Sequence, residues 1–217
     1  MNCCSTDQYA GTNKFFSRWS RKYAKSFRRK GLEKVQRHLL EGIEREPITS
    51  KEILDIGCGV GGLHLTLLEN GAARAVGIDL AEGMLQQARV IAKERGLEEK
   101  TTYVQGDFVA RADALPDADI TLLDKVVCCY EDLASLIYHS TRKTRQLYGI
   151  IHPRNAPVPR WIFKAQILFS RLFCMQFRPY WHDWQQMNEM IRGGGFRLLY
   201  ERPAILWNVA VFERVRS

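Results

Sequence analysis

Residues 53–62 read Ile-Leu-Asp-Ile-Gly-Cys-Gly-Val-Gly-Gly, and this stretch limits the fold more than any other segment. The apolar residues Ile53, Leu54 and Ile56 are typical of a buried strand, and the glycines after them predict a tight turn. Residues 63–68 then predict a helix. Parallel α/β sheets bind nucleotide-like ligands at such strand, turn and helix units, at the carboxyl end of the strand. The sequence therefore predicts an α/β fold with a ligand at this turn.

The spacing of the glycines narrows the kind of ligand. Gly57, Gly59 and Gly61 alternate, whereas a dinucleotide fingerprint has the form G-x-G-x-x-G. No Lys-Ser or Lys-Thr pair follows, which excludes a Walker phosphate loop. Asp55 stands two residues before the first glycine, where its charge repels phosphate and attracts an ammonium group. The turn is thus suited to a ligand that carries an amino group.

Three later strands end in polar residues at the spacing of repeated strand and helix units. A strand over 75–78 ends at Asp79, where Rossmann-like folds place an acid that contacts ribose. A strand over 102–105 runs into Gly106-Asp107-Phe108, and one over 120–123 runs into Asp124-Lys125. Singly, each motif has a plainer interpretation, because Asp79 and Asp107 could be helix N-caps. Together they predict one site at the sheet edge.

These four motifs, in this order, resemble those of class I S-adenosylmethionine (AdoMet) methyltransferases over residues 50–152. The resemblance implies a Rossmann-like, seven-stranded, mostly parallel sheet with an antiparallel last strand and helices on both faces. It also implies an N-terminal helical lid and a helical insertion after strand five. The implied cofactor is AdoMet, with S-adenosylhomocysteine as product and no metal.

The resemblance assigns roles to residues at the ends of the strands. Asp79 contacts the ribose, Met84 and Phe108 lie near the adenine, Asp107 accepts from the adenine amino group, and Lys125 lies at the methionine end. The cofactor-binding residues it implies are Asp55, Gly57, Cys58, Gly59, Gly61, Asp79, Leu80, Met84, Gly106, Asp107, Phe108 and Lys125.

We expect a single methyltransferase domain, 1–217, in four segments. Residues 1–50 form the helical lid, 51–152 the AdoMet-binding core, 153–182 the lid insertion, and 183–217 a helix and the last two strands. In the first segment, residues 13–43 show apolar spacings of three and four, which predict one or two amphipathic helices separated at Gly31. Three prolines within 152–160 predict a rigid loop after strand five. The aromatic and basic stretch 161–180 is expected to lie over the substrate.

Formal charge is distributed unevenly along the chain, whose net charge is +8. Residues 1–50 hold 11 Lys and Arg against 5 Asp and Glu, residues 51–132 hold 8 against 15, and residues 133–182 hold 8 against none. The basic flanks favour an anionic substrate or surface, although a solvated basic face explains them equally well. Their Trp, Tyr and Phe residues could contact a membrane surface or RNA, while core packing is the plainer alternative.

The cysteines and the ends of the chain bear on location. The six cysteines are Cys3, Cys4, Cys58, Cys128, Cys129 and Cys174. None has C-x-x-C spacing, and two adjacent pairs make a poor disulfide framework, which favours a reduced, cytoplasmic protein. Cys128-Cys129 is expected to continue strand four as small buried residues, with binding of a soft metalloid as the alternative. The N-terminus has no apolar region typical of a secretory signal. Residues 161–177 carry too many polar side chains for a membrane span.

Methyl transfer relies mainly on orientation, and a general base is required only for a poor nucleophile. The candidate catalytic residues on the substrate side are Tyr23, Tyr130, His152 and His182, although a lone histidine near a lid is more often structural. Residues 123–130 resemble a segment of magnesium-protoporphyrin O-methyltransferases, with Cys129 where that family has His.

The sequence therefore predicts a methyltransferase for a small, anionic and lipophilic molecule, with O-methylation favoured and peripheral membrane contact as a further expectation. Nucleic acid is a less favoured partner. The pI of 9.3 supports an RNA methyltransferase as the alternative. Against it, no Asn-Pro-Pro-Tyr motif follows strand four. The remaining alternative is a non-catalytic AdoMet-binding protein at a membrane surface.

Overall fold

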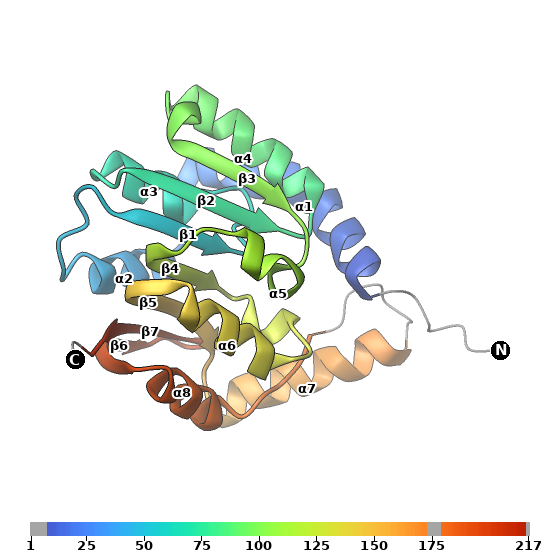
Figure 1. Ribbon diagram of the computed structural model, residues 1–217. Coiled ribbons are helices and arrows are strands. Elements are labelled where there is room, and N and C mark those ends of the chain that lie inside the picture. The colour runs from blue at the N-terminus through green and yellow to red at the C-terminus, as the bar shows by residue number, and fades with distance from the viewer. Residues whose placement is uncertain (1–7, 173–178, 216–217) are drawn as a thin grey trace.

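The computed structural model describes residues 8–172 and 179–215. Its strands form one seven-stranded sheet in the order β3-β2-β1-β4-β5-β7-β6 (Figure 1). The strands are β1 (Glu52–Ile56), β2 (Arg74–Asp79), β3 (Thr101–Gln105), β4 (Ala118–Asp124), β5 (Thr144–Pro153), β6 (Phe196–Pro203) and β7 (Trp207–Arg214). Strands β1 to β5 pair in parallel, and β7 is antiparallel to both its neighbours. The predicted fold class is confirmed.

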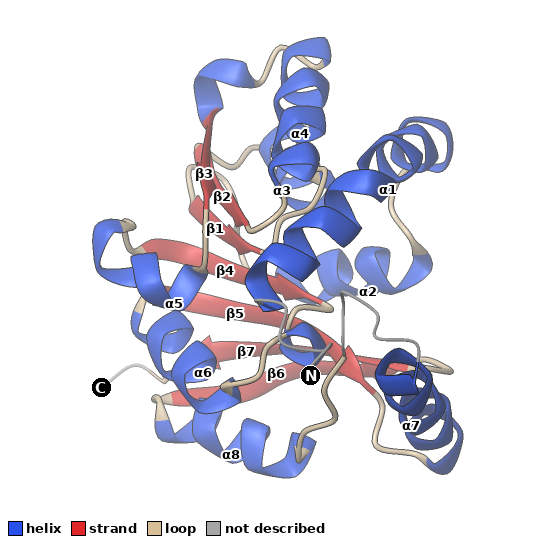
Figure 2. Ribbon diagram, turned by 90° about the vertical axis from the view of Figure 1, so that its right-hand side faces the viewer, coloured by secondary structure: helices blue, strands red, loops and turns tan. Residues whose placement is uncertain are grey.

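Helices cover both faces of the sheet (Figure 2). One layer contains α2 (Lys34–Ile43), α3 (Gly62–Glu69) and α4 (Glu82–Glu94), with α1 (Gln8–Lys30) packed against α4. The opposite layer contains α5 (Phe108–Arg111), α6 (Leu133–Arg142) and α8 (Trp184–Gly193). The helix α7 (Pro157–Leu172) follows β5. Short 3-10 turns lie at Glu98–Lys100, Ala112–Ala114 and Val127–Cys129.

Alternating side chains along the central strands build a core on each face of the sheet. In β5, Leu147 and Ile151 pack with α2 and α3, whereas Tyr148 and Ile150 pack with α6 and α8. All four side chains are buried. A strand with helices on both sides is apolar throughout, which is why these segments lack the polar alternation of a half-exposed strand.

The first helix ends as the sequence predicts. Gly31 follows α1 with a φ of +66° and separates it from α2. That conformation suits glycine, because in other residues the Cβ would be crowded by the backbone. The break lets α2 pack on the sheet against β5 and β7 while α1 packs on α4.

Two local predictions are wrong. The expected rigid loop at 152–160 is divided between β5 and α7, because the pairing of β5 with β7 extends to His152 opposite Asn208 and Pro153 opposite Trp207. Pro157 and Pro159 stand in the first turn of α7, where a missing N–H sacrifices no helical hydrogen bond.

Cys128 and Cys129 do not continue β4. Lys125, with a φ of +60°, ends that strand, and the two cysteines lie in the 3-10 turn that follows it. Cys3, Cys4 and Cys174 lie outside the described residues. Within the described part of the chain, no helix is both long and apolar enough to cross a membrane.

Candidate active site

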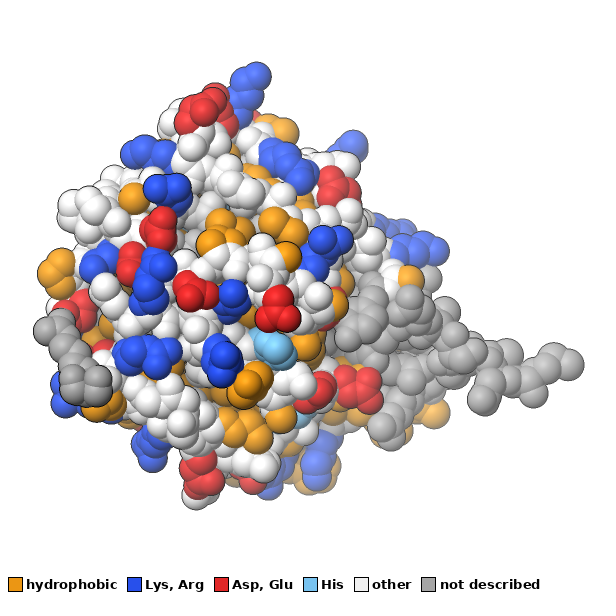
Figure 3. Space-filling model, in the orientation of Figure 1, with side chains coloured by type: hydrophobic (Ala, Val, Ile, Leu, Met, Phe, Trp, Pro, Cys, Tyr) orange, Lys and Arg blue, Asp and Glu red, His pale blue; other side chains and the backbone are white. Residues whose placement is uncertain are grey.

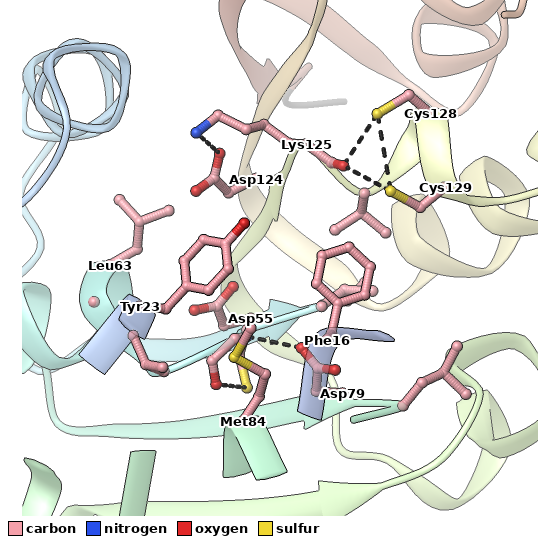
Figure 4. A pocket seen from close by; sticks show the side chains of 18 of the residues that line it. Phe16, Tyr23, Asp55, Leu63, Asp79, Met84, Asp124, Lys125, Cys128 and Cys129 are labelled. Carbon is pink, nitrogen blue, oxygen red and sulfur yellow. Dashed lines mark hydrogen bonds and ion pairs between the residues drawn. The ribbon is translucent and has the colours of Figure 1, made fainter. Parts of the chain in front are cut away.

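A cavity of about 580 Å³ lies at the carboxyl ends of β1, β2 and β4 (Figure 4). Its floor is the glycine turn after β1, and α1, α2 and α7 contribute the remaining walls together with Trp207 of β7. This volume is within the usual range of small-molecule sites. The switch point of a parallel sheet, where neighbouring crossovers run to opposite faces, is also the usual place for such a site.

Eleven of the twelve predicted cofactor-binding residues line this cavity. They are Asp55, Gly57, Cys58, Gly59, Asp79, Leu80, Met84, Gly106, Asp107, Phe108 and Lys125. Gly61 is the exception: it precedes α3 with a φ of +85°, and a Cβ there would meet the His64 ring at 3.0 Å. Glycine is therefore required at position 61 by the positive φ and by the close approach of His64 in α3, and not by contact with the cavity.

The glycine turn is held in place by β2. Asp79 accepts hydrogen bonds from the backbone N–H of Gly59 at 2.8 Å and of Ala81 at 2.8 Å. Burial raises the pKa of Asp79 from 3.8 to about 6, although both N–H donors favour the charged form. The carboxylate therefore joins two loops and also lines the cavity.

Asp55 has a partner that the sequence analysis missed. Its Oδ2 lies 2.7 Å from Nδ1 of His64, and Nε2 of His64 lies 3.0 Å from the hydroxyl oxygen of Tyr103. Asp55 and His64 are both buried. The carboxylate thus anchors α3 and β3 to the end of β1. A signal was present, because His64 stands between Leu63 and Leu65 in a predicted helix, and a buried histidine requires a hydrogen-bond partner.

Asp107 combines two roles within the protein. It is the N-cap of α5, accepting from the N–H of Ala110 at 2.8 Å, and it also accepts from the hydroxyl of Tyr130. The N-cap alternative from the sequence is confirmed. Tyr130 also lines the cavity, so its ring is fixed at the wall by this hydrogen bond.

A polar cluster between α2 and the end of β4 was not predicted. Gln36 donates to Oδ2 of Asp124 at 2.6 Å, and Lys125 donates to Glu33 at 2.6 Å. Burial raises the pKa of Asp124. All four side chains line the cavity. An acid at a strand end, like Asp55 and Asp79, was the signal for Asp124, whereas the contribution of α2 depends on tertiary packing alone.

The four catalytic candidates divide into two groups. Tyr23 and Tyr130 line the cavity. Burial raises the pKa of Tyr23, so its hydroxyl stays protonated at neutral pH and can donate a hydrogen bond. In Figure 4 the Tyr23 ring lies between Asp55 and Asp124.

The histidines lie elsewhere. His152 is buried in β5, its Nδ1 lies 2.9 Å from the carbonyl oxygen of Pro153, and it lines a second cavity with Trp184 and Asn208. Burial lowers its pKa to about 4. His182 donates to the carbonyl oxygen of Tyr130 at 2.8 Å and is absent from the cavity wall. The structure does not bring either histidine to the site.

The cavity wall is acidic, contrary to what the basic flanks suggested. Its acids are Glu33, Asp55, Asp79, Asp107 and Asp124, and Lys125 is the one Lys or Arg among the described residues that line it. On the outer face shown in Figure 3, Lys and Arg are interspersed with Asp and Glu. The positive charge of the flanks thus lies outside the cavity.

Two thiols stand at the wall. The Sγ atoms of Cys128 and Cys129 are 3.9 Å apart, and both thiols donate to the carbonyl oxygen of Lys125. The hydrogen bond with Cys128, together with burial, raises the pKa of Cys129, which keeps this thiol protonated. No group of three or more His, Cys, Asp and Glu suited to a metal ion occurs among the described residues.

The sheet order, the glycine turn and the acids at successive strand ends together define a Rossmann-like domain of the AdoMet-binding type. Residues 53–150 match the family model described as a methyltransferase domain. This match covers slightly less than half of the chain, which over this stretch is similar to methyltransferase domains in sequence and in fold.

Known proteins that are similar to this chain share its fold but are named for different substrates. Magnesium protoporphyrin IX methyltransferase from Synechocystis PCC 6803, solved with bound SAM, superposes with a TM-score of 0.71 at 15% identity, covering 97% of this chain and 99% of that one. Sterol 24-C-methyltransferase of Gibberella zeae is 32% identical over 40% of this chain and 22% of its own length. The 23S rRNA (uracil(1939)-C(5))-methyltransferase of Shewanella halifaxensis is 32% identical over 42% and 21%. The chain thus spans about a fifth of each of these two relatives.

Proposed function

We propose that the protein transfers a methyl group from AdoMet to a small, largely apolar molecule, with oxygen as the favoured acceptor atom. One observation carries this assignment: a single cavity connects the glycine turn with a chamber of apolar side chains. That chamber is built by Phe15, Phe16, Phe27, Ile162, Phe163 and Trp207. An apolar chamber beside a methyl-donor site suits an acceptor that buries most of its surface.

The residues present fit AdoMet at the glycine turn. Gly59 lines the cavity with a φ of +55°, and a Cβ added there would meet no atom within 4 Å. A ligand can therefore approach the backbone closely at this point. Met84 and Phe108 are buried side chains that supply apolar surface for a flat ring. When bound, AdoMet supplies an activated methyl group.

In this assignment the polar residues hold the ends of the cofactor. Asp79 accepts from the ribose hydroxyls, and Asp107 has lone pairs left for the adenine amino group. Asp55, Asp124 and the other wall acids favour the positive charges of the sulfonium and ammonium groups. Lys125, held by Glu33 at 2.6 Å, is the cation nearest to a ligand carboxylate at the methionine end.

The acceptor side of the cavity offers positioning more than base catalysis. Tyr23 stays protonated and orients the acceptor by donating a hydrogen bond. Tyr130 is already committed to Asp107. Asp124 is the better candidate for a base, because burial raises its pKa and its Oδ1, 3.9 Å from Nζ of Lys125, accepts no hydrogen bond. An acceptor that is already ionised, such as a carboxylate, requires no base.

The predicted anionic character of the acceptor has little support from the cavity. None of the described wall residues between 1 and 50 or between 133 and 182 is a Lys or Arg. The apolar part of the prediction therefore carries the proposal. Oxygen stays the favoured acceptor atom, because Asp124 can accept the proton of a hydroxyl acceptor. Binding of RNA is disfavoured for the same reason, since the wall presents acids where a phosphate backbone would need cations.

Two measurements test this function. Calorimetry is expected to show binding of AdoMet and S-adenosylhomocysteine, and no binding of either would overturn the assignment. Methyl-labelled AdoMet is then incubated with separated small-molecule and RNA fractions of a lysate. Label is expected in the small-molecule fraction. Label in ribonuclease-sensitive material would instead establish the RNA alternative. Phe163→Ser is expected to reduce turnover while leaving S-adenosylhomocysteine binding unchanged.

A further inference from the structure

The helix α7 exposes an apolar surface to solvent. Six large hydrophobic side chains on this helix are between 45% and 73% exposed. They are Val158, Trp161, Ile162, Leu168, Phe169 and Leu172. Scattered exposed hydrophobic residues are ordinary, but a contiguous set on one element marks a surface that contacts something else.

The spacing places these side chains on one face of the helix. Val158, Trp161, Ala165, Leu168 and Leu172 recur at alternating intervals of three and four residues, and all five are exposed. Intervals of this kind form one stripe along an α-helix, and Ile162 and Phe169, three and four residues from Ala165, widen it on one side. The inward side is occupied by other residues, chiefly the buried side chains of Phe163 and Ser170. The helix therefore has a second apolar face that points away from the protein.

The charge beside this stripe has one sign. The sequence of α7 contains no Asp or Glu, and residues 133–182 hold 8 Lys and Arg with no acid at all. Arg160 and Lys164 are four residues apart, so they share a helix face, and both are exposed. Neither forms an ion pair with an acid among the described residues. An apolar stripe bordered by basic side chains complements an anionic, apolar surface.

The stripe also adjoins the cavity. Ile162, Phe163 and Gln166 of α7 line the cavity, and Ile162 is at the same time 45% exposed. One side chain thus belongs both to the cavity wall and to the outer apolar face. A surface that covers α7 would lie next to the cavity.

We propose that α7 is an interfacial helix that docks on the surface of an anionic lipid bilayer, with its apolar stripe in the headgroup region. A second copy of this chain fits less well. Pairing α7 with its own copy would bring basic residues together, with no acid on either helix to balance them. The aromatic residues of α1 are a weaker candidate for the membrane-binding surface, because Phe15, Phe16 and Phe27 line the cavity. The assignment does not depend on methyl transfer.

Vesicle co-sedimentation of the full chain tests this proposal. One set of vesicles contains phosphatidylglycerol and phosphatidylcholine in equal parts, and the other contains phosphatidylcholine alone. We expect the protein to sediment with the anionic vesicles, to sediment less with the neutral ones, and to be partly released by high salt. The double substitution Trp161→Gln with Phe169→Gln is expected to weaken partition more than tenfold. Lys164→Glu is expected to weaken it at least about fivefold.

Matched substitutions elsewhere control for general effects of surface change. Val90→Gln with Tyr138→Gln removes two exposed hydrophobic side chains from α4 and α6, and Lys93→Glu reverses an exposed charge on α4. These variants are expected to bind vesicles like the wild type. Circular dichroism melting checks that every variant folds.

Three results would overturn the proposal. The first is a wild-type protein that stays in the supernatant with both kinds of vesicle. The second is equal binding by the α7 variants and the controls. The third is a dimer in sedimentation velocity that Trp161→Gln with Phe169→Gln dissociates, which would assign the stripe to a second copy. Because every readout is binding, these results are distinguishable from a failure of methyl transfer.

Discussion

Replacing Asp79 by alanine should separate ligand binding from folding. The substitution removes the acceptor of two backbone N–H groups, each worth about 1.5–3 kcal/mol when the acceptor is charged. It also relieves a buried carboxylate whose pKa is raised from 3.8 to about 6, a difference worth about 3 kcal/mol when both states are fully ionised. These two effects oppose each other, so we expect a net destabilisation of only about 0–3 kcal/mol.

The loss of ligand affinity in Asp79→Ala is not offset by a second effect in this way. If Asp79 accepts from the two ribose hydroxyls, alanine removes both hydrogen bonds to a charged group, and the affinity for S-adenosylhomocysteine should fall more than about 100-fold. Calorimetry measures the affinity, and urea denaturation measures the free energy of unfolding. Asp113→Ala, at an exposed acid in the 3-10 turn Ala112–Ala114, is the control. An Asp79→Ala variant that binds within tenfold of the wild type would refute the assignment of Asp79 to the ribose.

The pH dependence of folding offers a further check on Asp79. Because its folded pKa of about 6 lies above the unfolded value of 3.8, the folded state holds the proton more tightly. The stability from this group is therefore largest in acid and is lost as the pH rises from about 4 to 6. Between pH 5 and pH 7.5 the loss amounts to about 1.4 kcal/mol. We expect this decline in the wild type relative to Asp79→Ala, and parallel curves for the two proteins would contradict the burial of the charge.

Three other outcomes are expected. Gly57→Ala should destabilise the protein by about 1–3 kcal/mol more than Gly59→Ala in urea denaturation. A Cβ at position 57 would lie 2.5 Å from the Val126 side chain, whereas one at position 59 would meet no atom within 4 Å. Equal losses in the two variants would contradict this close approach to Val126. His64→Ala should cost about 3–5 kcal/mol because it leaves the Asp55 carboxylate buried without its partner, whereas a loss below about 1 kcal/mol would argue against the pair. His152→Gln should leave turnover unchanged. The His152 pKa is lowered from 6.5 to about 4 in the folded state, so the free energy of unfolding of the wild type falls as the pH decreases from 7 to 5. In His152→Gln this fall should be smaller by about 1.8 kcal/mol. Unchanged acid sensitivity would show that His152 is not buried in its neutral form.

The donor side of the site could be predicted from the sequence because it is local. Each strand end and the turn after it carry their own signal, as glycines at 57 and 59 or as an acid at 79. Parallel strands in one sheet bring these ends to the same edge without any further information. The predicted residues therefore meet in one cavity even though they lie up to 70 residues apart.

The parts of the cavity wall that lie away from the strand ends could not be predicted in the same way, because they depend on tertiary packing. Glu33 and Gln36 reach the cavity only because α2 packs beside the end of β4. His152 resembled a catalytic residue because it follows strand five in the sequence. In the structure β5 continues to Pro153, so His152 pairs with Asn208 of β7 and lines a second cavity. The sequence predicts that this strand ends at Ile151, and its continuation to Pro153 was enough to place the His152 side chain at a different site.

The boundary of the family match explains why the donor is clearer than the acceptor. The match covers residues 53–150, which contain the glycine turn and every predicted cofactor contact. All six residues of the apolar chamber lie outside it, in α1, α7 and β7. Elements that only cover the sheet edge can change without disturbing the turn, so one donor site can serve many acceptors. Relatives named for sterol and for ribosomal RNA match only 40% and 42% of the chain, which is consistent with such a division.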